Sequence, residues 1–244
     1  MRTSNPALSD KIFKDVRSDE TRMTLSGTVN KCYLLIGILL VAAFWSWRNT
    51  LAADGTISIP GWYLPGIFAT FIISLVIIFK KTSAPYLAWI YAAGEGLLLG
   101  ALSALYEVKY NGIVLQAVCC TAGVFIALLF AYKTKLIQAT ENFKLGVVAA
   151  TGGIAIVYLI SFVASFWNVQ IPYLHDSSPI GIGISVFIVI IAALNLVLDF
   201  DFIEKGAEAG APKYMEWYAA FGLLVTLVWL YLEILRLLSK TRKK

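Results

Sequence analysis

Acidic side chains inside long apolar segments are the residues of this sequence that could do chemistry. The deepest is Glu95, in the segment AAGEGLLLGALSALY. An ionisable side chain at the centre of a lipid bilayer costs about 2.5–3.5 kcal/mol on insertion scales, so such positions are rare and often functional. One interpretation is a protonated Glu95 that hydrogen-bonds to a neighbouring helix. The other is a polar element of a pore or cavity, beside a GxxxG step (Gly96 and Gly100) that lets another helix approach closely.

A second acidic group follows in NLVLDFDFIEKGAE. Asn195 and Asp199 are four residues apart and share one helix face, whereas Asp201 points elsewhere. Glu216 follows after the next connection. Carboxylates crowded at one end of a helical bundle repel each other and attract cations. The alternative is a solvated acidic helix end, although large apolar residues alternate with the two aspartates.

A third acidic position, Glu233, lies in LVWLYLEILRLL near the far end of the last apolar segment. Arg236 follows three residues later, which is close enough on a helix for an ion pair. This spacing favours anchoring at the membrane interface over a role in ion passage.

The residue sets used by common enzymes are absent from the sequence. The single histidine, His175, is next to Asp176 in a connection, and there is no HExxH, GxSxG or phosphate-binding glycine loop. Asp199 and Asp201 lie on one helix, so they cannot face each other as the two aspartates of an intramembrane protease must. The sequence therefore predicts neither an enzyme nor a cofactor.

The elements that position these residues are predicted to be membrane-spanning helices. Of the 244 residues, 59% are hydrophobic and 14% are charged, whereas a soluble domain has roughly 45–50% and 25%. Apolar runs near the length of about 20 residues that crosses a bilayer predict seven spans in an all-α bundle. The runs are Cys32–Trp47, Trp62–Phe79, Ala84–Tyr106, Gly112–Tyr132, Leu145–Trp167, Pro179–Leu198 and Tyr214–Ser239.

Basic residues predict the orientation of these spans. Most lysines and arginines fall before the first span and in alternate connections, which places the N-terminus in the cytoplasm and indicates membrane topology, not nucleic-acid binding. We expect a cytoplasmic arm over residues 1–30, a transmembrane domain over 31–239 and a basic tail over 240–244. Seven crossings put this tail outside, against the same rule, so a re-entrant last segment is the alternative.

The motifs together resemble the Bax inhibitor-1 family, and the fuller pattern is similar to its bacterial YccA-like branch. They are SNPALSDKIF, MTLSGTVNK, the Glu95–Gly96 pair with Gly100, DFDFIEKG followed by APKYMEWYAAFGLL, and LYLEILRLL. The resemblance implies six helices around a central seventh and a bacterial inner-membrane location. It also implies a proton-sensitive calcium leak governed by two aspartates, on the sixth and seventh helices.

The first of these aspartates matches Asp199, but the second has no clean match. One alignment places it at Glu233 and another at Thr226, which cannot titrate. If the connection centres near Glu208, Glu216 lies level with Asp199, whereas Thr226 lies about 13 Å deeper. We therefore expect Asp199 and Glu216, with Asp201 next, to share a proton and to contact Ca²⁺ transiently.

Two functional hypotheses follow from the sequence. The first is a pH-sensitive cation leak, with Glu95 and Asp199 on the ion route. The second is a non-conducting regulator that binds a membrane protease or another membrane protein through the N-terminal arm.

Overall fold

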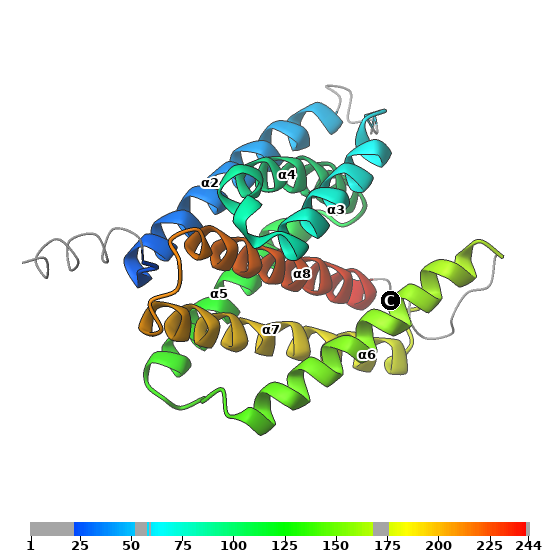
Figure 1. Cartoon of the computed structure of the whole chain (residues 1–244). Helices are drawn as coiled ribbons and strands as arrows, with labels where there is room; N and C mark the ends of the chain where they lie inside the picture. Colours follow the sequence, from blue (N-terminus) through cyan, green and yellow to red (C-terminus); the bar gives the residue numbers. More distant parts are fainter. Residues whose placement is uncertain (1–21, 52–57, 59, 168–175, 243–244) are drawn as a thin grey trace, which may run out of the picture.

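The computed structural model describes residues 22–51, 58, 60–167 and 176–242, and its regular elements are helices (Figure 1). They are α2 (Leu25–Thr50), α3 (Tyr63–Phe79), the 3₁₀ turn η2 (Lys81–Ser83), α4 (Ala84–Lys109), α5 (Ile113–Lys133), α6 (Glu141–Ser165), α7 (Pro179–Glu208) and α8 (Met215–Arg242). Within these described ranges the chain forms no β-strand, and an isolated bridge joins Arg22 and Pro212. The all-α prediction is confirmed, and the seven α-helices match the seven predicted spans.

Six of the helices are long and apolar enough to cross a membrane, and α3 is the shorter exception. Its 17 residues extend about 26 Å, somewhat less than the roughly 30 Å hydrocarbon layer. Large apolar side chains such as Val41, Phe71 and Phe162 are exposed on the perimeter. A surface of this kind needs lipid as its surroundings.

Several helices begin at side-chain caps. The hydroxyls of Thr24, Thr140 and Ser178 accept hydrogen bonds from the backbone at the starts of α2, α6 and α7. Such caps satisfy amide groups that have no partner inside the helix. Because α2 begins at Leu25, the last residues of the predicted N-terminal arm are helical, and residues 1–21 lie outside the described part of the chain. At the other terminus, α8 includes Lys240–Arg242 of the predicted tail.

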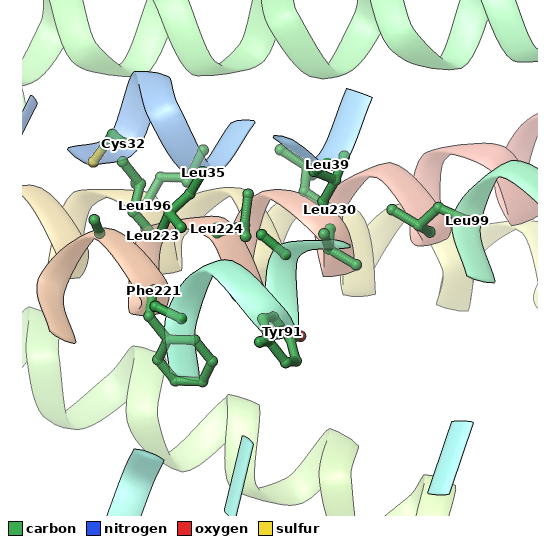
Figure 2. Close-up of a cluster of buried hydrophobic side chains, with 14 of the residues drawn as sticks. Cys32, Leu35, Leu39, Tyr91, Leu99, Leu196, Phe221, Leu223, Leu224 and Leu230 are labelled. Atoms are coloured by element: carbon green, nitrogen blue, oxygen red, sulfur yellow. The ribbon is translucent and has the colours of Figure 1, made fainter. Parts of the chain in front are cut away.

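Helix α8 lies in the middle of the arrangement (Figure 1). It packs against α2, α4, α5 and α7, whereas α3 packs mainly on α4 and α6 mainly on α7. Buried leucines of α8, among them Leu223, Leu224 and Leu230, meet Leu35 and Leu39 of α2 in the core (Figure 2). The least exposed apolar side chains of the bundle therefore lie around the last helix.

Helices α2 and α4 approach each other more closely than ordinary side chains would allow. A Cβ atom at Gly96 would collide with the carbonyl oxygen of Leu39, and one at Gly100 with that of Ala43. The close helix approach predicted from the GxxxG step is present, and α2 is the partner.

Helix α8 crosses the bundle from end to end. Its first turn contacts Thr24 at the start of α2, and at its other end Arg242 donates a 2.7 Å hydrogen bond to the carbonyl of Asn111, between α4 and α5. The first contact is at the start of α2 and the second is at the end of α4. These lie at opposite ends of the bundle, because the chain reverses its direction from each helix to the next. An end-to-end path of this kind favours a seventh crossing over the re-entrant alternative.

Candidate functional site

Asp199 lies inside α7, where α2 and α8 meet it. The predicted sixth span stops at Leu198, but α7 continues to Glu208, so both aspartates of this segment are helical residues. Leu196 and Phe200 on either side are buried, and Leu196 lies close to Cys32 of α2 in the core (Figure 2). The thiol of Cys32 on α2 is near enough to interact electrostatically with Asp199, so the carboxyl group lies on the side of α7 that meets α2.

A polar partner of Asp199 comes from α8. The hydroxyl of Thr226 is within hydrogen-bonding reach of the carboxyl group and also donates to the carbonyl of Gly222 at 3.3 Å. The second carboxyl oxygen, Oδ2, is buried and has no hydrogen-bond partner among the described residues. Leaving a buried polar atom unpaired costs about 1–3 kcal/mol. Such a cost inside a membrane bundle indicates a site that a proton, water or cation completes.

Glu216 occupies a different site from Asp199, so the predicted pair is wrong. Its side chain is fully buried and accepts 2.9 Å hydrogen bonds from the amide and the hydroxyl of Thr24. Lys31 forms an ion pair with it, and Lys213 forms another at 3.1 Å. Glu216 therefore fastens the start of α2 to the start of α8.

The physical reason for this error is the position of the connection between α7 and α8. Helix α7 ends at Glu208 and α8 begins at Met215, so the turn is centred several residues beyond Glu208. When the centre of the connection moves by one residue, the residue of α8 that lies level with Asp199 moves by two. The residue facing Asp199 is therefore roughly 10 Å further along α8, toward Thr226.

Backbone contacts reinforce the attachment of Glu216. The amide of Met23 donates a 2.7 Å hydrogen bond to the carbonyl of Ala211, and Met23 is buried against Gly206. A Cβ at Gly27 would collide with the carboxylate of Glu216, so the absence of a side chain there leaves room for the acid.

Asp201 lies on the outer side of the junction of α2, α7 and α8 and forms ion pairs. Its Oδ2 atom lies 2.8 Å from the ammonium group of Lys144 on α6 and 3.1 Å from that of Lys205. Asp201 is therefore an ion-pair residue between α6 and α7, separate from the site around Asp199.

Glu95 lines a cavity of about 290 Å³ between α3 and α4. Tyr63, Thr70, Ser74 and Tyr91 contribute hydroxyl groups to the same cavity, and the hydroxyl of Tyr91 is within hydrogen-bonding reach of the Glu95 carboxyl group. This environment is compatible with both interpretations of Glu95. The residue has a hydrogen-bond partner on its own helix, and it also borders a cavity. The cavity does not include Asp199 among its lining residues.

Glu233 is buried in a network at the far end of α8. It accepts hydrogen bonds from Tyr158 at 2.8 Å and from the indole of Trp229 at 3.2 Å. The guanidinium of Arg236 donates to both carboxylate oxygens at 3.0 Å. The predicted pairing of Glu233 with Arg236 is confirmed, and Tyr158 extends it to α6.

Two residues that matter in this arrangement were misjudged or missed in the sequence. Thr226, which one of the two alignments matched to the second aspartate, was placed too deep by the assumed centre of the connection. Lys31 pairs with a residue 185 positions away, and no local pattern indicates that contact. Among the described residues, no three His, Cys, Asp or Glu side chains gather in a way that could hold a metal ion.

Comparison with known proteins gives one match. A family model described as Bax inhibitor 1 like matches residues 5–243, nearly the whole chain. No curated protein matches the chain, and no solved structure does.

Proposed function

Because the chain belongs to the Bax inhibitor 1 like family, we propose that it is a pH-sensitive cation leak channel, with Ca²⁺ as the expected ion and Asp199 as the group that senses protons. The observation that carries the proposal is the Oδ2 atom of Asp199 at the junction of α2, α7 and α8, which is buried and has no hydrogen-bond partner in the described part of the chain. Carboxylate oxygens are suitable ligands for hard cations such as Ca²⁺. Glu95 is a second carboxylate on the proposed route, in its own cavity.

Protonation of Asp199 sets the direction of the pH dependence. The protonated acid is neutral and leaves the apolar contacts of α7 with α2 and α8 intact. Loss of the proton leaves an anion that needs water or a cation as its partner, and admitting either loosens the junction. Flux should therefore rise as pH rises.

This mechanism differs from one that depends on a pair of carboxyl groups. Thr226 can donate or accept a hydrogen bond but cannot carry a negative charge at neutral pH. Asp199 therefore titrates alone in the proposed mechanism, and a single group gives a shallow pH dependence that extends over about two pH units.

The test is Ca²⁺ flux into liposomes containing the purified full chain, measured between pH 5 and pH 8. We expect Asp199→Asn to remove the rise with pH, because the amide keeps the size of the side chain but cannot ionise. Glu95→Gln should lower flux at every pH without changing the shape of the curve. Glu141→Gln is the matched control, since Glu141 is an exposed acid on α6.

Two outcomes would reject the proposal. One is an unchanged pH profile in Asp199→Asn, which would remove Asp199 from the sensing role. The other is no flux at any pH from a correctly folded protein, which would favour the non-conducting regulator.

A further inference from the structure

A cavity of about 300 Å³ opens between the last turns of α4 and α8, at the end of the bundle away from the connection between α7 and α8. It is separate from the site around Asp199. Basic and hydroxyl-bearing residues make up much of its wall, which consists of Leu102, Leu105, Tyr106, Lys109, Tyr110, Arg236, Ser239 and Lys240. No acidic residue is among these lining side chains in the described part of the chain.

Three cationic side chains thus border one small space. Lys109 is exposed and lies over the ring of Tyr110, with its ammonium group 5.5 Å from the ring centre. Within the described part of the chain, Arg236 donates to Glu233 and Tyr158 through Nη1. The other N–H groups of the guanidinium therefore stay available to a ligand in the cavity.

Lys240 distinguishes this cavity from a patch of exposed surface charge. It is only 4% exposed, and its ammonium group donates to the carbonyl of Gly181 at 3.0 Å and to the hydroxyl of Ser185 at 2.8 Å. A buried lysine is costly to desolvate unless its charge is balanced. Here the charge has partners, since Gly181 and Ser185 accept from it and the carboxylates of Glu233 and Asp176 are close enough to interact with it.

Tyr110 supplies an independent observation. Its hydroxyl is buried and has no hydrogen-bond partner among the described residues, and Tyr110 lines the same cavity. An orphaned buried hydroxyl carries a cost of about 1–3 kcal/mol that a bound acceptor would remove. Lys109, the remaining N–H groups of Arg236 and the Tyr110 hydroxyl are donors that a ligand with several acceptor oxygens and a negative charge would satisfy.

We propose that this cavity binds a phosphate-type anion, supplied either by the headgroup of an anionic phospholipid or by free inorganic phosphate. Arginine and lysine side chains with a hydroxyl are a common set of donors for phosphate oxygens. Basic pockets between membrane helices bind anionic lipid headgroups in the same way. The volume is at the low end for ligand sites and suits a headgroup or an ion, with acyl chains remaining in the bilayer.

The experiment uses the full chain in nanodiscs of phosphatidylcholine, with and without phosphatidylglycerol, and in detergent with inorganic phosphate. Native mass spectrometry measures retained phosphatidylglycerol, and calorimetry measures phosphate binding. We expect Tyr110→Phe, which removes only the hydroxyl, to weaken binding about tenfold. Lys109→Gln, an exposed position, should weaken it about threefold. Arg48→Gln is the matched control, because Arg48 is an exposed cation in the last turn of α2 that does not line the cavity.

The arms of the experiment separate the two sources. Retention of phosphatidylglycerol that depends on Tyr110, without binding of inorganic phosphate, identifies the lipid headgroup, and the reverse identifies the free ion. The proposal is overturned if neither ligand binds, or if Arg48→Gln weakens binding as much as Lys109→Gln.

Discussion

Asp199 on α7 and Thr226 on α8 face each other inside the bundle, within hydrogen-bonding reach, and one oxygen of the aspartate has no partner among the residues that the structure describes. This relationship links the helix that carries Asp199 to the central helix. It also places a single titratable group where the family resemblance implied two.

Changing Thr226 to aspartate should restore a pair of facing carboxyl groups. Two such groups at close range titrate in coupled steps, because the first negative charge opposes the second. We expect the flux of Thr226→Asp to respond to pH in two resolved steps, where the unmodified chain responds in one. Thr226→Val is the control for loss of the hydroxyl, and it should keep a single step. A single unshifted step in Thr226→Asp would show that position 226 does not interact with Asp199.

Glu216 should matter for stability more than for pH sensing. Glu216→Gln keeps an acceptor for Thr24 but removes the charge that pairs with Lys31 and Lys213. Because Lys31 and Lys213 are partly exposed and stay hydrated, we expect a loss of about 1–3 kcal/mol, less than for a wholly buried pair. Urea unfolding in detergent measures this, with Glu141→Gln as the control near zero. Loss of the pH dependence of flux in Glu216→Gln would show instead that Glu216 takes part in pH sensing.

The contact between α2 and α4 should depend on Gly100. Alanine there would drive a methyl group into the backbone carbonyl of Ala43, so we expect Gly100→Ala to cost about 1–3 kcal/mol despite the better helix propensity of alanine. Gly152→Ala on α6 is the matched control, because a Cβ there meets nothing within 4 Å. That variant should be neutral or slightly more stable, and equal stability of the two variants would contradict the close contact.

The crossing of α8 predicts opposite locations for the two termini. A reporter fused before Met1 should read cytoplasmic, as the basic residues indicate, and one fused after Lys244 should read external. Both reporters on the same side would contradict an end-to-end path for α8.

Features carried by neighbouring residues were predictable from the sequence. Apolar runs located the helices, the GxxxG step at Gly96 and Gly100 predicted a close helix contact, and the three-residue spacing of Glu233 and Arg236 predicted their ion pair. Each depends on the periodicity of one helix.

Features that depend on how distant helices align were not predictable in the same way. Thr24 and Glu216 are separated by 192 residues, and no local pattern indicates their contact. The partner of Asp199 depended on where a short connection is centred, and an error of a few residues there selected the wrong acid.

The central place of α8 has a consequence for biosynthesis. Chains are made from the N-terminus, and early segments begin to fold before later ones exist. Helices α2, α4, α5 and α7 all pack against a helix that leaves the ribosome after them. Until it arrives, the Asp199 carboxyl group lacks Thr226 and the start of α2 lacks Glu216. A nascent chain stalled before α8 therefore presents an unsatisfied acid within the membrane, a feature that quality-control machinery could recognise.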